Sequence, residues 1–134
     1  MTEVATTTIA AVLDALSFDA NGLVPAIAQQ HDTGEVLMMA WMNKDAIAET
    51  LTTGRVCYWS RSRGQLWRKG ETSHQFQHLK EFRIDCDGDT ILLLVEQEGG
   101  ACHTGRRACF YRAVRDGELV EIAKPLIDPE KLYG

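Results

Sequence analysis

Three cysteines that could bind a metal lie in residues 85–109: Cys86, Cys102 and Cys109. Three thiolates form a soft site suited to zinc and leave one coordination position for water, whose pKa the zinc would lower. The intervals of 15 and 6 intervening residues lack the paired C-x2-C knuckles of a closed structural site. The alternative is three unrelated thiols. We interpret Cys57 as a small buried hydrophobic residue, because it lies in a predicted apolar strand whose side chains alternate between the two faces.

Three carboxylates surround the first of these cysteines, at Asp85, Asp87 and Asp89. They offer a hard, oxygen-only site suited to magnesium. In an extended chain they would point to one side and Cys86 to the other, so the two sites would be adjacent but distinct. Asp and Gly are also common in ordinary hairpin turns, which is the alternative. An EF-hand loop is excluded because Thr90 occupies the position that needs glycine.

The histidines leave several roles open. His103 follows a cysteine and could be a fourth ligand, a general acid or base, or a hydrogen-bonded polar residue. His74 and His78 would suit a metal pair on a helix, but Phe76 between them fits a strand equally well. A metal-activated water needs a proton acceptor beside it. Our first candidate for this role is His103 and our second is His74.

The charge distribution indicates a small anionic ligand. A net charge of −5 argues against a general nucleic-acid binder. Residues 1–54 hold seven acids and one base, whereas residues 55–69 hold five bases and no acid. A local basic patch on an acidic protein favours binding of a small anion. The predicted contacts are Arg61, Arg63, Trp67, Arg68, Lys69, Thr104, Arg106 and Arg107.

The length of 134 residues, with 45% hydrophobic residues, fits one compact domain over residues 1–134. The first 16 residues carry acids and no basic leader, so we interpret them as an amphipathic helix and not as a secretory signal. No apolar run approaches the roughly 20 residues of a membrane helix. We therefore expect a cytoplasmic protein with reduced thiols and no membrane partner.

Hydrophobic patterning predicts an α+β domain with two helices and mostly antiparallel strands. The second helix starts after the N-cap Asn43 and stops at Gly54. Residues 61–73 are polar, basic and glycine-containing, and we expect a long loop or irregular hairpin there. The predicted strands span residues 24–28, 36–41, 55–60, 80–85, 91–96, 108–114 and 118–122.

Several segments together resemble the phosphoribosyl-AMP cyclohydrolase family of histidine biosynthesis. They are LMMAWMN, TGRVCYWSRSRGQLWRKGETS, DCDGDT and GGACHTGRRACFYR, and they fall within residues 22–115. The resemblance implies hydrolytic opening of the purine ring of N1-phosphoribosyl-AMP at the N1–C6 bond, with zinc and magnesium as cofactors. The family usually has glycine and serine where this chain has His74 and Ala108.

The resemblance also assigns ligands and a partner. Cys86, Cys102 and Cys109 would bind zinc, and the three aspartates would bind magnesium. The basic residues would hold the two phosphates of the substrate. The family is homodimeric, and we predict an intertwined dimer whose zinc site takes Cys86 from one chain and the other two cysteines from its partner.

Two rival functions follow from the same residues. A zinc nucleobase deaminase would also act on a purine, but its H-x-E and P-C-x-x-C motifs are absent from the sequence. A zinc-stabilised module without catalysis would use the basic, tryptophan-containing segment to bind a nucleotide or RNA. The acidic net charge weighs against RNA.

Overall fold

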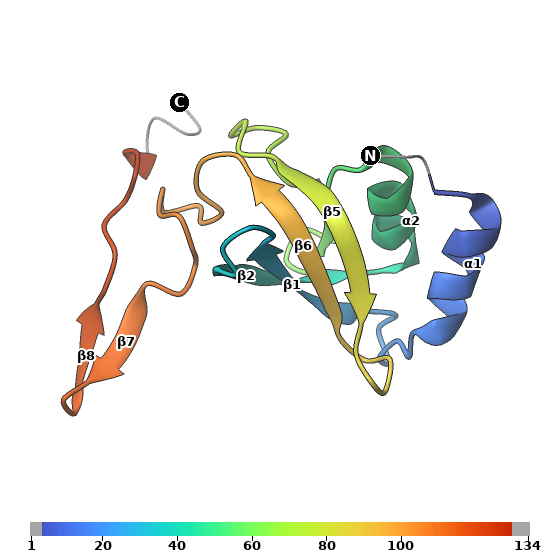
Figure 1. Cartoon of the computed structure of the whole chain (residues 1–134), viewed down its shortest axis with the longest axis horizontal. Helices are drawn as coiled ribbons and strands as arrows, with labels where there is room; N and C mark the ends of the chain where they lie inside the picture. The colour runs from blue at the N-terminus through green and yellow to red at the C-terminus, as the bar shows by residue number, and fades with distance from the viewer. Residues whose placement is uncertain (1–3, 130–134) are drawn as a thin grey trace.

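A curled six-stranded sheet with two helices makes up the body of the computed structural model, which describes residues 4–129 (Figure 1). The strand order is β4-β3-β2-β1-β6-β5. A separate two-stranded hairpin follows near the C-terminus. The elements are α1 (Thr6–Ala15), β1 (Val24–Gln30), β2 (Val36–Met42), α2 (Lys44–Thr53), β3 (Cys57–Ser60), β4 (Gln65–Arg68), β5 (Gln77–Ile84), β6 (Ile91–Gln97), β7 (Arg112–Arg115) and β8 (Glu118–Glu121).

The second helix has the ends that the sequence predicts. The Asn43 side chain accepts a 2.9 Å hydrogen bond from the Ala46 N–H and caps the helix. Gly54 ends it in the left-handed region at φ 77°, where glycine has no steric penalty. Its buried residues, such as Ile47 and Leu51, pack into the core. None of the helices in residues 4–129 has the length and apolar character needed to span a bilayer.

Alternating burial along β1 and β6 places the core on one face of the sheet. In β6, Ile91, Leu93 and Val95 are fully buried and alternate with half-buried residues. β1 and β6 are parallel neighbours, with Ile27 opposite Leu92, and all other strand pairs are antiparallel. The predicted α+β class with mostly antiparallel strands is therefore confirmed.

Three elements differ most from the sequence predictions. The segment predicted as a long loop or irregular hairpin contains the regular strand β4, because Gly64 turns the chain at φ 63° and lets it pair with β3 in a hairpin. β5 begins at Gln77 and not at residue 80. The strand predicted from residue 108 begins only at Arg112, because the Cys109 N–H donates to the Leu37 carbonyl, outside any strand ladder.

The β7–β8 hairpin projects away from the sheet and the two helices (Figure 1). Its apolar side chains include Val114, which is 75% exposed, and Leu119, which is 67% exposed. An exposed apolar arm of this kind is typical of a surface that binds another protein.

Candidate functional site

The three aspartates converge at the turn between β5 and β6. Carboxylate oxygens of Asp85, Asp87 and Asp89 lie within 4.8 Å of one another. The Asp87-Gly88 pair predicts a hairpin turn between two strands, and the chain makes that turn, with Asp85 Oδ1 accepting a 3.0 Å bond from the Asp89 N–H. The extended backbone assumed for placing Cys86 on the opposite side from the carboxylates is therefore absent. Hydrogen bonds with Asp87 and Asp85 raise the pKa of Asp89 to about 6. A divalent cation would relieve this crowding of negative charge.

Gly88 fixes this turn against the end of α1. Its φ is 74°, and a Cβ added there would lie 2.4 Å from the Ala15 carbonyl oxygen. The Ser17 N–H donates a 2.7 Å hydrogen bond to the Gly88 carbonyl. Glycine is therefore required both for the backbone conformation and for the close approach.

Two of the three candidate zinc ligands lie together in the loop after β6. Cys102 is 3% exposed, and its Sγ lies 3.0 Å from Thr104 Oγ1. Cys109 is partly buried and interacts with Cys102 through its side chain. Burial, followed by the neighbouring Cys102, raises the pKa of the Cys109 thiol to about 12, and Lys69 opposes this rise.

Cys86 lies at the other end of β6. It is exposed in the turn before that strand, whereas Cys102 follows the strand. Seven residues of β-strand span roughly 20 Å. Within residues 4–129 the three thiols therefore do not form one cluster. We predicted that the thiolate site and the carboxylate site would be adjacent. Within one chain, the Cys102–Cys109 pair and the three aspartates lie at opposite ends of β6.

The fourth cysteine belongs to the core, as predicted. Cys57 is 1% exposed, and its N–H donates to Thr50 Oγ1 at 2.9 Å. Burial raises the pKa of its thiol to about 12.

A cavity of about 320 Å³ lies along β4 and the residues that follow it. Four of the predicted ligand-binding residues line it, namely Arg63, Trp67, Arg68 and Lys69. Three residues of the GETS segment, Glu71, Thr72 and Ser73, also line the cavity. They supply one carboxylate and two hydroxyls. The cavity thus presents several cations and hydroxyls, which are groups that bind phosphate.

Lys69 connects this cavity with the thiol pair. It is 4% exposed and lines both this cavity and a second one of about 390 Å³. Burial lowers the pKa of its ammonium, while Cys109 and Cys102 oppose that change. Its Nζ also lies 5.5 Å from the centre of the Trp67 ring.

The other basic residues of the patch have partners within the chain. Arg68 forms two hydrogen bonds of 2.8 Å with Glu49, which lines the second cavity. Arg61 stacks on Trp41 at 4.6 Å and faces a third hollow, which Trp67 also lines. The two tryptophans therefore offer aromatic surface beside cations, and the binding role of these residues stays a prediction.

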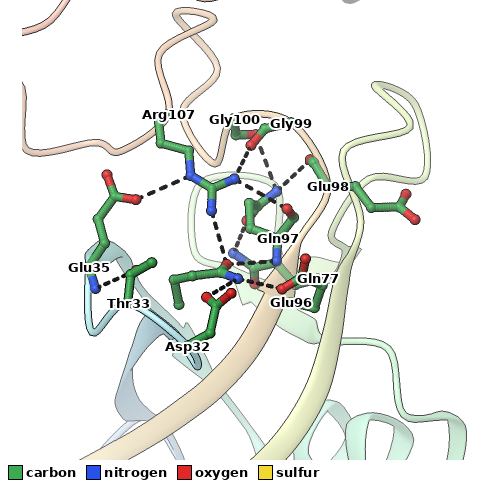
Figure 2. A network of polar contacts seen from close by, with 11 residues as sticks. Asp32, Thr33, Glu35, Gln77, Glu96, Gln97, Glu98, Gly99, Gly100 and Arg107 are labelled. Carbon is green, nitrogen blue, oxygen red and sulfur yellow. Dashed lines mark hydrogen bonds and ion pairs between the residues drawn. The ribbon is translucent and has the colours of Figure 1, made fainter.

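Arg107 anchors the loop that carries Cys102 (Figure 2). Its guanidinium donates to the Gly99 carbonyl at 2.6 Å and to the Gln97 carbonyl at 3.2 Å. It also donates to Gln30 Oε1 at 3.0 Å and to Glu35 Oε1 at 3.2 Å. Four acceptors occupy this side chain, and none of them belongs to the cavity beside Lys69.

Arg106 is also engaged within the chain, by residues that come after the loop in the sequence. It donates to the Ala123 carbonyl at 2.9 Å and to Glu121 at 3.2 Å, and it lies 3.8 Å from the Tyr111 ring centre. Its side chain is 12% exposed. The contacts of Arg106 therefore tie the loop to the C-terminal segment.

The histidines differ in their surroundings. His103 is exposed and directly follows Cys102. His74 is exposed and has a left-handed backbone at φ 61°. His78 lies on β5 with Nε2 3.0 Å from Glu98 Oε1, so the strand interpretation is correct and the helical metal pair is wrong.

Sequence reasoning missed the buried polar network below the loop. Gln77 and Gln97 are buried, and the Gln77 amide donates to Gln97 Oε1 at 2.8 Å. Gln30 is 3% exposed and accepts from the Gln97 N–H at 3.0 Å. The only signal in the sequence is a glutamine at the inward position of an otherwise apolar strand, as in residues 24–30 and 91–97.

Comparison with known proteins places these features in one family. The family model described as "PRA-CH: Phosphoribosyl-AMP cyclohydrolase" matches residues 38–111. A relative from Paramagnetospirillum magneticum named phosphoribosyl-AMP cyclohydrolase is 71% identical over 92% of this chain and 94% of its own length. One from Rhodospirillum centenum with the same name is 68% identical over 96% of this chain and 97% of its own.

Proposed function

The chain belongs to the phosphoribosyl-AMP cyclohydrolase family, and from this premise we propose that it opens the purine ring of N1-(5-phosphoribosyl)-AMP in cytoplasmic histidine biosynthesis. One observation carries the proposal beyond the family name. The cationic cavity and the Cys102–Cys109 pair meet at a single buried side chain, Lys69. A phosphate-binding surface therefore adjoins a pair of soft metal ligands.

The chain offers a donor set that fits zinc. Cys102 and Cys109 would supply two thiolates, and Cys86 of a second chain would supply the third. Zinc with three protein ligands and an open position activates water at neutral pH. The Thr104 hydroxyl beside Cys102 Sγ would help to orient that ligand.

Ring opening adds the oxygen of water to C6 of the adenine and breaks the N1–C6 bond, so that C6 and its exocyclic nitrogen become a carboxamide. His103 accepts the proton of the attacking water, since it is exposed directly beside Cys102. Arg63 and Arg68 bind phosphate at the cavity, and the Trp67 ring stacks on the base. The departing nitrogen then receives a proton.

A homodimer would complete the site. The exposed Cys86 lies too far from Cys102 to share a metal ion within one chain, so the third ligand must come from elsewhere. The projecting β7–β8 hairpin, with exposed Val114 and Leu119, supports a second copy as the partner. Association would bury this apolar surface.

Magnesium would bind Asp85, Asp87 and Asp89 at the β5–β6 turn. Their oxygens already converge within 4.8 Å. If the turn of one chain approaches the cysteine loop of its partner, the magnesium site adjoins the zinc site and can hold a substrate phosphate.

Turnover of N1-(5-phosphoribosyl)-AMP, followed by absorbance together with metal analysis of the same sample, tests the function. We expect ring opening that depends on bound zinc and on added magnesium. The alternative, a zinc-stabilised nucleotide- or RNA-binding module, predicts binding without turnover, and that result would refute the proposal.

A further inference from the structure

All three tryptophans of the chain line one open hollow at the sheet. Trp41 of β2, Trp59 of β3 and Trp67 of β4 border a space of about 610 Å³. Trp41 and Trp59 are directly opposite each other in the antiparallel β2–β3 pair, so their side chains lie on the same face of the sheet. Both are half-buried, and Met39, which lines the same hollow, is 45% exposed. The hollow therefore presents aromatic and apolar surface to solvent.

A cation lies over this aromatic surface. The Arg61 guanidinium lines the hollow and lies 4.6 Å from the centre of the Trp41 ring. Within residues 4–129 it forms no ion pair with a carboxylate. Planar bases stack on indole rings and on guanidinium planes alike, and an uncompensated positive charge favours an anionic ligand. The combination suits the base of a nucleotide.

Two features join the hollow to the cationic cavity along β4. Trp67 lines both spaces. Ser60, which lines the hollow, accepts hydrogen bonds through Oγ from the N–H of Arg63 at 3.3 Å and from its Nε at 3.4 Å, and Arg63 lines the cavity. A nucleotide carries a planar base and a phosphate on one ribose, which matches an aromatic hollow that adjoins a cationic cavity.

We propose that Trp41, Trp59 and Arg61 form a base-binding subsite, in which the purine stacks while a phosphate binds in the cavity along β4. This rests on the proposed function and adds Trp41 and Trp59 to Trp67 as contacts of the base. Indole is the side-chain ring that attracts positive charge most strongly, so it suits an adenine made electron-poor by substitution at N1. A second copy of the chain is the rival occupant, but Arg61 and the adjoining cations favour a compact anion.

Binding of AMP and of ribose 5-phosphate to the purified protein, each measured by calorimetry, separates the base from the phosphate. Trp41→Leu and Trp59→Leu each remove an indole and keep an apolar side chain, whereas Trp59→Phe keeps an aromatic ring. Phe82→Leu is the matched control, because Phe82 is a half-buried aromatic residue on β5, at the other edge of the sheet from β4. Circular dichroism verifies the fold and sedimentation the oligomeric state.

We expect each tryptophan-to-leucine variant to bind AMP about tenfold more weakly, the effect of losing one base–aromatic stack. Affinity for ribose 5-phosphate should stay within about twofold of wild type. Trp59→Phe should retain most of the AMP affinity, and Phe82→Leu should match wild type. In turnover of N1-(5-phosphoribosyl)-AMP, the KM of the two tryptophan-to-leucine variants should rise about tenfold.

Unchanged AMP affinity and KM in folded tryptophan-to-leucine variants would overturn the proposal and leave the proposed function intact. A wild-type protein that does not bind AMP would overturn it as well. Loss of AMP affinity that always accompanies loss of self-association would assign the hollow to the contact between two copies and refute the subsite. AMP binding that depends on the indoles, without ring opening, would support the subsite and refute the proposed function.

Discussion

Arg107 donates a 3.0 Å hydrogen bond to the buried amide oxygen of Gln30, 77 residues earlier in the chain. The same oxygen accepts from the Gln97 N–H at the end of β6. One amide therefore joins the end of β1, the end of β6 and the loop that carries Cys102. The geometry of the candidate zinc ligands depends on this buried network.

Arg107→Ala should lower the free energy of unfolding by about 2–3 kcal/mol, because it leaves the Gln97 and Gly99 carbonyls and the Gln30 amide without their cationic donor. Urea unfolding at a fixed protein concentration measures this. Lys80→Ala, at an exposed position of β5, is the control and should change stability by less than about 0.5 kcal/mol. Equal stability of the two variants would show that the network is dispensable.

His74→Gly should raise the free energy of unfolding by about 0.5–1 kcal/mol, because φ is 61° at this residue and glycine adopts that region without strain. Thermal unfolding checks the sign. Turnover should fall less than tenfold, whereas His103→Ala should lower kcat by about a hundredfold or more. A larger loss in His74→Gly than in His103→Ala would make His74 the proton acceptor.

Asp87→Asn should weaken magnesium binding by about tenfold or more and leave the zinc content unchanged, because a carboxylate is lost only from the oxygen cluster. Calorimetry with magnesium and elemental analysis for zinc separate the two sites. Asp116→Asn in the β7–β8 turn is the matched control. A parallel fall in zinc content would indicate a single mixed cluster instead of two sites.

Cys102→Ser should abolish zinc retention and turnover together, because one of three ligands is lost. Cys57→Ser should keep zinc and cost about 1–2 kcal/mol of stability, since a hydroxyl replaces a thiol in the core. Metal content, turnover and unfolding are measured on both proteins. Full turnover by zinc-free Cys102→Ser protein would contradict the catalytic role.

Local signals in the sequence were sufficient for several elements. The helix after Asn43 has its predicted cap and its glycine stop, because both depend only on neighbouring residues. The convergence of the three aspartates also follows from short-range spacing, because the turn that Asp87-Gly88 predicts brings the three carboxylates together.

Long-range contacts account for what the sequence did not reveal. The partners of Arg107 come from β1 and from the end of β6, and neither its charge nor its neighbours in the sequence indicate them. The burial of Lys69 was equally hidden, because its local sequence is polar and basic while its surroundings are assembled from distant segments. The late start of β7 reflects the bond from Cys109 to Leu37, which pairing rules do not predict.

The arrangement of the three cysteines is tested most directly by mixing two inactive proteins, Cys86→Ala and Cys102→Ala. In a shared arrangement each heterodimer has one site with both lesions and one intact site. Random exchange puts about half of the dimers in this form, so activity should recover to about a quarter of the wild-type value. If each chain built its own site, every site would carry a lesion, and no recovery after verified subunit exchange would contradict the shared zinc centre.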